Sequence, residues 1–328
     1  MDNKINIGII GAAGYTGGEL LRIVINHPNV NIAFAHSKSQ IEKPVYATHT
    51  DLLGDTELTF SGEDIQTLLN QQDLQAIFLC SGHGESKKFL TEYQVPETLK
   101  IIDLSTDFRD ESNGFTYGLP ELQKETIRGA TKIANPGCFA TSIELAILPL
   151  ANAGLLKDDV HVSAVTGSTG AGQSLSATTH FSWRNNNLSI YKAFSHQHLT
   201  EIKMSLKKLQ AGFDNSVNFV PYRGDFTRGI MANVYTPYSG TIEEAKELYK
   251  NYYAEHPFTH VSDSPIDVKQ VVNTNKCFIH LEVHEGQLLI SSIIDNLTKG
   301  ASGQAVQNLN LIFGLPEDAG LRLKAPSF

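Results

Sequence analysis

Cysteine is scarce in this chain of 328 residues, which has only Cys80, Cys138 and Cys277. So few thiols, odd in number, are poor material for the disulfide framework that stabilises many small secreted domains. The first ten residues also lack the long apolar core of a secretory signal. We therefore expect reduced thiols and a cytoplasmic protein.

Long apolar runs and an excess of positive charge are also absent. No uninterrupted apolar run approaches the roughly 18 residues of a membrane span, so we expect no membrane association. The 26 Lys and Arg residues are outnumbered by 35 Asp and Glu residues, which gives a net charge of -9. This balance argues against nucleic-acid binding, whose usual signature is a basic patch. It leaves room for a local basic pocket that binds a phosphorylated small molecule.

The length of the chain predicts two domains, because 328 residues are too many for one ordinary core. An apolar strand at 4–10, a helical pattern at 18–26 and a second strand at 30–36 form a β-turn-α-β unit. That unit is typical of one half of a nucleotide-binding fold. Further strands alternate with helices up to residue 137, which favours a Rossmann-like, doubly wound parallel sheet.

The pattern changes after Cys138. A long helix is predicted at 140–153, followed by strands at 160–166, 216–220, 229–235, 277–284 and 287–294. This order predicts an α+β domain with a mixed sheet, and a final helix at 302–313 that packs back on the first domain. We therefore predict an α/β chain in which 1–137 and 299–328 bind the nucleotide. Residues 138–298 would form the catalytic and oligomerisation domain.

Three glycines at every third position form a candidate dinucleotide site. Gly11, Gly14 and Gly17 follow the first strand and precede the first helix. Glycine lets the backbone approach a pyrophosphate, and the N-terminus of a helix supplies N–H groups and partial positive charge. The spacing differs from the usual G-x-G-x-x-G, so a tight turn without a ligand is the alternative.

The end of the second strand favours NADP(H) over NAD(H). An NAD enzyme usually has a carboxylate there, which holds the ribose hydroxyls. This chain has His36-Ser37-Lys38-Ser39, and Lys38 with two hydroxyls suits a 2′-phosphate. The alternative is that Lys38 is a solvated surface residue. The candidate cofactor contacts in this half are Gly11, Ala13, Gly14, Tyr15, Thr16, Gly17, Ser37, Lys38, Ser39, Ser81 and Gly82.

Cys138 is the candidate nucleophile. It follows an Asn-Pro-Gly turn at 135–137 and precedes the long helix, so its sulfur should lie at a helix N-terminus. The helix dipole and free N–H groups there lower a thiol pKa, and the thiolate is the form that attacks a carbonyl carbon. A buried structural cysteine is the alternative, and we interpret Cys80 and Cys277, in apolar runs, in that way.

A thiolate beside a nicotinamide suggests a thioester that is reduced to an aldehyde, and that reaction needs a general acid/base. His196 and His198 precede a predicted helix whose first turn carries Glu201. Either imidazole could transfer the proton, and Glu201 could orient one of them. Structural histidines near a helix start are the alternative.

In these motifs the sequence resembles the N-acetyl-γ-glutamyl-phosphate reductase family, which is related to aspartate-semialdehyde dehydrogenase. The resemblance covers almost the whole chain, and the joint order of its motifs is more specific than any one of them. The matching segments lie at 11–17, 103–109, 117–121, 135–141, 167–172, 196–202, 220–224 and 299–305.

The resemblance implies NADPH-dependent reduction of N-acetyl-γ-glutamyl phosphate to N-acetylglutamate 5-semialdehyde and inorganic phosphate, in arginine biosynthesis. It implies that Cys138 forms the thioester and that the His196/His198 pair supplies the acid/base. We prefer His198 as the base, with His196 as its partner or as a substrate ligand. It also implies a loop at 168–172 beside the reacting centre and a homo-oligomer, a dimer or a tetramer. No metal is expected. The family pattern adds Ser168, Gly170 and Asn296 to the cofactor contacts.

Four residues are the candidate substrate contacts: Arg109, Asn135, Glu201 and Arg223. A guanidinium suits either a phosphate or a carboxylate through bidentate hydrogen bonds. For each arginine the alternative is a surface or interdomain ion pair.

Three departures from the family pattern are visible: Thr200 where Pro is common, Gln173 where a basic residue is common, and Tyr222 where Met is common. None removes a group that the mechanism needs, but Gln173 leaves the acyl group open, since an N-succinyl substrate would add a carboxylate. The sequence also allows an aspartate-semialdehyde dehydrogenase or a non-catalytic NADP-binding sensor. The first of these usually has a histidine after a Val-Pro segment, and residues 220–224 contain none.

Overall fold

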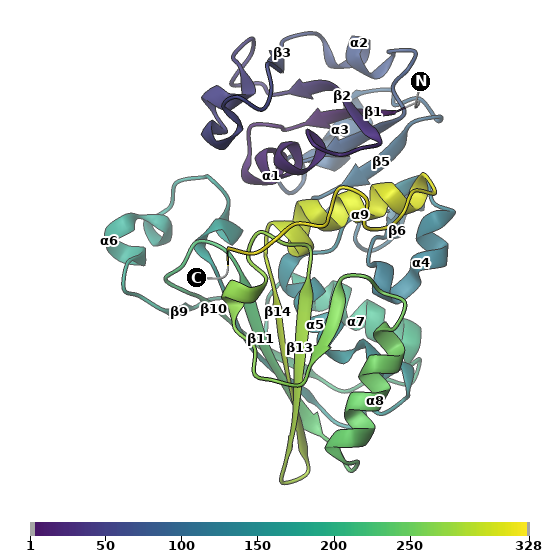
Figure 1. The fold of residues 1–328 in the computed structure, drawn as a ribbon, viewed down its shortest axis with the longest axis vertical. Coiled ribbons are helices and arrows are strands. Elements are labelled where there is room, and N and C mark those ends of the chain that lie inside the picture. The colour runs from purple at the N-terminus through teal and green to yellow at the C-terminus, as the bar shows by residue number, and fades with distance from the viewer. Residues whose placement is uncertain (1–3, 327–328) are drawn as a thin grey trace. The chain divides into compact units, whose positions relative to one another are not determined.

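The computed structural model describes residues 4–326 and separates into two compact units. The first comprises the chain up to Pro136 together with Ala301–Arg322, and the second comprises Gly137–Gly300 and the residues from Leu323 onward (Figure 1). The last helix, α9 (Gly303–Ile312), therefore belongs to the first unit.

The first unit contains a seven-stranded sheet in which every pair of neighbours is parallel. Its order is β3-β2-β1-β4-β5-β7-β6, and the order reverses between β1 and β4, where such sheets bind nucleotides. The strands are β1 (Ile5–Ile10), β2 (Val30–His36), β3 (Phe60–Ser61), β4 (Ala76–Leu79), β5 (Lys100–Asp103), β6 (Thr116–Tyr117) and β7 (Lys132–Ala134). The helices are α1 (Tyr15–Val24), α2 (Ile65–Leu69), α3 (Glu85–Glu92), α4 (Pro120–Arg128) and α9.

Two helix starts differ from the sequence-based prediction. Helix α1 begins at Tyr15 rather than at residue 18, because Gly14 is its N-cap and two further glycines adopt helical geometry. Helix α5 (Cys138–Asn152) begins at the cysteine itself, two residues before the predicted start. Both starts are difficult to detect from the sequence. Glycines at the start of α1, and the Pro-Gly pair before α5, contribute nothing to the apolar periodicity that predicts a helix.

The second unit contains a mixed sheet of seven strands, in the order β12-β13-β14-β11-β8-β10-β9. The pairs β8/β10 and β12/β13 are parallel and the others antiparallel. The strands are β8 (Val160–Thr166), β9 (Ser189–Ile190), β10 (Val217–Arg223), β11 (Ile230–Pro237), β12 (Thr259–Ser262), β13 (Cys277–His284) and β14 (Gln287–Ile294). The longer helices are α5, α7 (His198–Leu209) and α8 (Ile242–Tyr253), which pack on the sheet.

The two faces of this sheet differ in burial. Along β8 the side chains alternate, with Val162 and Ala164 buried while Ser163 and Val165 stay partly exposed. Helix α5 lies against the buried face and is itself buried from residue 139 to residue 151. We call the opposite side the open face. It carries His161, Ser163, Val165, Asn218, Val220, Tyr222, Met231, Asn233, Tyr235, Phe278, His280, Glu282, Leu289 and Ser291.

A long excursion, residues 167–197, joins β8 to α7. It contains two 3-10 turns, η4 (Ser168–Ala171) and η5 (Ala177–Thr179), the short helix α6 (Phe181–Arg184) and strand β9. Figure 1 shows α6 at the end of a loop that extends away from the strands of the sheet. Leu175, Phe181 and Phe194 are exposed there. No period runs through this segment, so the sequence predicted no elements in it.

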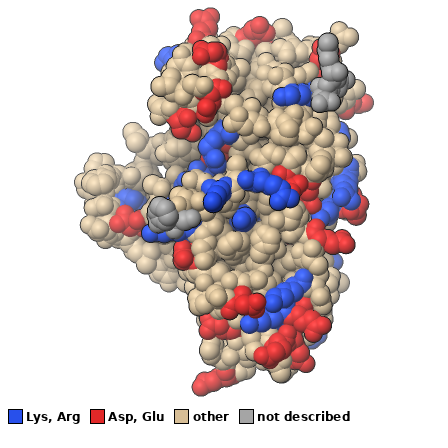
Figure 2. All heavy atoms as spheres, viewed as in Figure 1, with Lys and Arg blue, Asp and Glu red and all other residues tan. Residues whose placement is uncertain are grey.

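The surface carries charges of both signs, in keeping with the mixed composition. On the face drawn in Figure 2, acidic and basic side chains are interspersed among uncharged ones. On α8, for example, Lys246 and Lys250 both pair with Asp263. Among residues 4–326, no helix has both the length and the apolar character that a bilayer crossing requires.

Candidate active site

Cys138 is the first residue of α5 and is partly exposed. Gly137 caps the helix in an extended conformation, with φ −71° and ψ 152°. The turn predicted at 135–137 thus places the cysteine where unpaired backbone N–H groups point outward. Cys80 and Cys277 are both buried, as expected, and burial raises the pKa of the Cys80 thiol.

Glu201 joins the cysteine turn to the histidine segment. Its Oε2 accepts a hydrogen bond of 3.0 Å from the Gly137 N–H, and its Oε1 lies 3.8 Å from Nε2 of His198. Both side chains are buried. Because one carboxylate contacts the base of α5 and the imidazole together, it sets where the imidazole lies relative to the start of α5.

His196 lies beside His198, with 4.5 Å between the ring centroids. Its Nδ1 accepts the His198 backbone N–H at 3.3 Å, and the rings of Phe139 and Phe219 pack edge-on against it. Burial, and then the positive charge of Lys192, lower the pKa of His196 to about 4. His196 is therefore a neutral acceptor at neutral pH, and His198 is the better candidate for proton transfer.

Gly300 approaches the nucleophile closely and was not singled out from the sequence. It lies in a π-helical turn, Thr298–Ser302. A Cβ added to Gly300 would lie 2.9 Å from Cβ of Cys138 and 3.2 Å from its Cα. Only glycine fits at this distance without moving the cysteine.

Tyr191 connects the reacting centre with Arg223. Its ring lies 5.7 Å from that of His196, and the Arg223 guanidinium carbon lies 4.8 Å from its centroid. Burial and the nearby Cys138 raise the pKa of Tyr191, while Arg223 opposes that shift. Arg223, predicted from the sequence, is thus near the cysteine through Tyr191, which was not predicted.

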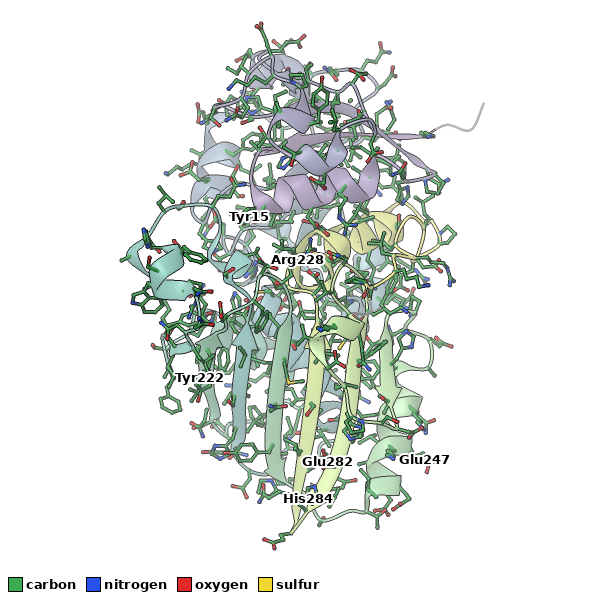
Figure 3. All side chains as sticks on the ribbon, turned by 60° about the vertical axis from the view of Figure 1, so that its left-hand side comes forward. Tyr15, Tyr222, Arg228, Glu247, Glu282 and His284 are labelled. Atoms are coloured by element: carbon green, nitrogen blue, oxygen red, sulfur yellow. The ribbon has the colours of Figure 1, made fainter. Side chains whose placement is uncertain are left out.

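Three predicted cofactor residues of the second unit lie in one neighbourhood. Asn296 donates to Thr169 at 3.0 Å and accepts from the Gly229 N–H at 2.7 Å, so it ties η4 to the start of β11. Ser168 and Gly170 belong to the same η4 turn. Next to it, Arg228, labelled in Figure 3, pairs with the buried Asp295 at 2.9 Å.

Arg109 and Asn135, predicted substrate contacts, belong to a buried network in the first unit. The Arg109 guanidinium donates to the carbonyls of Asn135, at 2.9 Å, and Leu104, at 3.2 Å. The Asn135 amide donates to the Ala301 carbonyl at 3.0 Å. These bonds hold the backbone that leads into the cysteine turn.

The glycines between β1 and α1 in the first unit have different structural roles. Gly11 has a φ of +81°, which favours glycine, and its N–H donates to the His36 carbonyl at 3.1 Å. A Cβ on Gly17 would lie 2.6 Å from the Ala12 Cα, whereas one on Gly14 would meet nothing closer than 3.7 Å. Gly17 therefore serves packing, and Gly14 leaves its backbone open at the start of α1.

The carboxyl ends of β1, β2 and β4 lie side by side at one edge of the sheet, around this turn. The Gly11 Cβ position would lie 3.1 Å from the Ser81 backbone nitrogen, so the loops after β1 and β4 are adjacent. After β2, Ser37 is buried and Lys38 is exposed, and the Lys38 charge contributes, after burial, to the lowered pKa of His36. The predicted cofactor residues of this unit thus lie at the carboxyl ends of three neighbouring strands.

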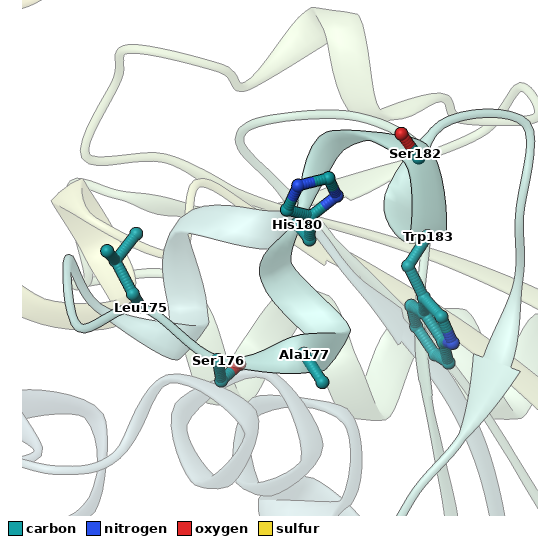
Figure 4. A pocket seen from close by; sticks show the side chains of 6 residues that line it. All are labelled: Leu175, Ser176, Ala177, His180, Ser182 and Trp183. Atoms are coloured by element: carbon teal, nitrogen blue, oxygen red, sulfur yellow. The ribbon is translucent and has the colours of Figure 1, made fainter.

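A hollow of about 640 Å³ lies in the excursion, lined by Leu175, Ser176, Ala177, His180, Ser182 and Trp183 (Figure 4). None of these side chains is a thiol or a carboxylate. His180 and Ser182 alone do not provide an acyl-transfer centre without an oriented base. The centre around Cys138 therefore remains the candidate active site.

Comparison with known proteins agrees with this geometry. Residues 6–130 match the NAD binding domain of semialdehyde dehydrogenases, and residues 138–296 match their dimerisation domain. These matches define the class. A curated relative from Christiangramia forsetii is 56% identical over 99% of this chain and all of its own length, and one from Bacteroides fragilis is 54% identical over the same shares. Both are named N-acetyl-gamma-glutamyl-phosphate reductase, and the chain belongs to that family.

Solved structures support the fold. Aspartate semialdehyde dehydrogenase II from Vibrio cholerae matches with a TM-score of 0.72 over 95% of this chain and 99% of its own, at 17% identity. The enzyme from Francisella tularensis matches with a TM-score of 0.70 over 94% of this chain and all of its own, at 16% identity. The predicted combination of a Rossmann-like domain and a mixed-sheet domain is therefore confirmed.

Proposed function

We propose that this chain reduces N-acetyl-γ-glutamyl phosphate with NADPH, giving N-acetylglutamate 5-semialdehyde and inorganic phosphate. The observation that carries the proposal is the placement of Cys138 at the start of α5, where Glu201 contacts both Gly137 and His198. The names of the full-length relatives supply the substrate. The reaction belongs to arginine biosynthesis.

The chain's own residues perform the acyl transfer. His198 accepts the Cys138 proton, and the thiolate adds to the γ-carbonyl carbon. Backbone N–H groups at the start of α5 stabilise the oxyanion, phosphate leaves, and a thioester remains on the sulfur. After reduction, the protonated His198 returns its proton as the C–S bond breaks and the aldehyde leaves. Glu201 keeps His198 oriented throughout, and His196 stays neutral.

The first unit fits a dinucleotide. Gly14 leaves room beside the start of α1, and no carboxylate follows β2, where a 2′-phosphate would otherwise be repelled. We assign Gly11 to Gly17 to the pyrophosphate and Ser37, Lys38 and Ser39 to the 2′-phosphate. Bound NADPH supplies the hydride that brings the acyl group to the aldehyde level.

For the substrate anions, we assign Arg223 to direct binding and Arg109 to the backbone that leads into the cysteine turn. Arg223 lies against Tyr191, beside the reacting centre. The guanidinium of Arg109 already donates to two carbonyls of its own unit, so its replacement should act through the position of Asn135.

We also propose a homo-oligomer assembled through the open face, and a cytoplasmic location. The dimerisation-domain match covers the whole sheet, and the open face carries Val165, Val220, Met231, Phe278 and Leu289, with no helix of the described residues packed over them. A sheet face of that composition is normally covered. All three cysteines are thiols rather than disulfides, which suits a reducing compartment.

The test is turnover of the Cys138→Ser variant in phosphate-dependent reduction of NADP by N-acetylglutamate semialdehyde. Loss of the thiolate should lower kcat at least ~10³-fold, because a serine hydroxyl is a weak nucleophile here. Cys277→Ser makes the same change far along the chain and should keep near wild-type kcat. Full turnover by Cys138→Ser would overturn the proposal. Wild-type activity with aspartate semialdehyde alone would move the protein to the sister activity.

A further inference from the structure

Arg184, the last residue of α6, is a buried cation whose hydrogen-bonding capacity is mostly unused. Its side chain is only 6% exposed, although its neighbours on both sides are exposed. One terminal nitrogen donates to the Asn187 carbonyl at 2.7 Å, and the guanidinium lies 5.1 Å from the Trp183 ring centroid. The Nε and the other terminal nitrogen are buried and have no hydrogen-bond partner among the described residues.

A second guanidinium, that of Arg223, lies close enough to act on the charge of Arg184. Arg223 lowers the pKa of Arg184 by its like charge, an effect second only to burial. The Nε of Arg223 is likewise buried without a partner in residues 4–326, while one terminal nitrogen makes a long contact of 3.4 Å with Thr178 and the guanidinium also contacts Tyr191. Asp225 partly offsets the charge of Arg184, but its Oδ2 accepts the Asn186 N–H at 2.7 Å. Neither arginine forms an ion pair within the described part of the chain.

Buried guanidinium nitrogens without partners, two on Arg184 and one on Arg223, are costly unless an anion binds them. Each guanidinium presents N–H groups in a planar fork that matches the two oxygens of a carboxylate. The pairing of β9 with β10 sets Ser189 opposite Arg223, which brings the excursion and its Arg184 against the strand that carries Arg223. Tyr191, which contacts Arg223, also lies 5.7 Å from His196, measured between ring centroids, so the vacant donors belong to the neighbourhood of the candidate reacting centre.

We propose that Arg184 and Arg223 form a carboxylate-binding subsite for the substrate, in which Arg184 is a specificity-determining residue. The inference rests on the proposed function, because it assumes an acylated glutamyl substrate.

Two carboxylates could occupy this subsite. The α-carboxylate of the glutamyl group lies four bonds from the carbonyl carbon that Cys138 attacks. A carboxylate at the end of a succinyl group lies eight bonds away. An extended chain covers about 3.4 Å per three bonds, so the two reach ~5 Å and ~9 Å from that carbon.

The experiment compares wild type, Arg184→Gln and Lys207→Gln, a control on an exposed part of α7. The KM values are measured for N-acetylglutamate semialdehyde, for N-succinylglutamate semialdehyde and for phosphate. We expect Arg184→Gln to raise the KM of a semialdehyde at least ~10-fold, the usual effect of losing charge-assisted hydrogen bonds, with kcat changed less. The KM for phosphate and all values for Lys207→Gln should stay within about twofold.

The pattern of KM changes identifies the source of the carboxylate. A rise with both semialdehydes supports the α-carboxylate, and a rise with the succinyl compound alone supports the acyl carboxylate. Unchanged KM values for both semialdehydes, or a rise for phosphate alone, would overturn the subsite. Arg184→Lys is the second variant should Arg184→Gln fold poorly, because it keeps the charge but loses the fork. Wild type that is inactive with both semialdehydes would instead refute the proposed function.

Discussion

At the residue scale, the central feature is the division of work between two neighbouring histidines. Both are buried, but only His198 contacts Glu201, while His196 accepts a backbone N–H and is held neutral by burial. We therefore assign proton transfer to His198, the imidazole that has a carboxylate to stabilise its charged form. In this assignment His196 stays uncharged and accepts the His198 backbone N–H, which holds the position of His198.

The lowered pKa of His196 predicts a loss of stability in acid. Its folded pKa of about 4 lies below the unfolded value of 6.5, so the unfolded chain binds more protons between these values. Stability is therefore complete above about pH 6.5 and falls as pH drops toward 4, by up to roughly 3 kcal/mol from this group. Urea unfolding of wild type and His196→Asn at pH 7 and pH 5 measures the difference.

His196→Asn should flatten that pH dependence, because its amide oxygen can accept the His198 N–H without titrating. His284→Asn, at the exposed end of β13, removes a histidine elsewhere and should leave the dependence as in wild type. An unchanged pH dependence in His196→Asn would show that the buried imidazole does not supply it.

The sequence predicted Cys138, His198, Glu201 and Arg223, because each lies within a motif or beside a recognisable helix start. It did not predict Arg184. That residue lies in a segment without periodicity, and an arginine in such a segment is normally solvated. Its burial and its vacant donors arise from the folding of the whole excursion, which no local pattern encodes.

At the element scale, we expect two glycines at the start of α1 to have different roles, Gly17 in stability and Gly14 in NADPH binding. Gly17→Ala should lower the melting temperature, because its Cβ would overlap Ala12, while Gly14→Ala should leave it within about 2 °C. Gly14→Ala should nevertheless raise the Kd for NADPH at least ~10-fold, since a methyl group would stand where the pyrophosphate approaches. Thermal unfolding and NADPH titration of both variants measure this, and unimpaired NADPH binding by Gly14→Ala would contradict the assignment.

The π-helical turn at 298–302 makes a second prediction. Gly300→Ala should lower kcat ~10–100-fold without unfolding the protein, because the new methyl group would push against Cβ of Cys138 and shift the sulfur. Gly212→Ala is the matched control, since a Cβ there meets nothing within 4 Å. Equal kcat for the two variants would show that the cysteine tolerates displacement.

The regular elements were predictable where the period was continuous. The strands Val160–Thr166, Cys277–His284 and Gln287–Ile294 have the bounds that the sequence predicted. Two-residue strands such as Thr116–Tyr117 and Ser189–Ile190 were missed, because so short a segment has no period and forms only where a neighbouring strand pairs with it.

At the scale of the whole molecule, the open face predicts the assembly. Leu289→Asp places a charge on β14 in the middle of that face and should shift the protein from an oligomer to the 36.0 kDa monomer. Light scattering coupled to size exclusion measures the mass. Leu175→Asp makes the same change on the excursion, where the side chain is exposed. Dissociation by Leu175→Asp alone would place the interface on the excursion instead.

The close approach of Gly300 to Cys138 also describes how the second unit is built into the chain. Its main segment, Gly137–Gly300, begins and ends at residues that lie close together, because a Cβ on Gly300 would lie 2.9 Å from Cβ of Cys138. A folded insert with touching ends interrupts its host at little cost in loop-closure entropy. In evolutionary terms, a nucleotide-binding fold can acquire a folded segment at a single backbone position, and the proposed nucleophile, Cys138, lies next to that junction.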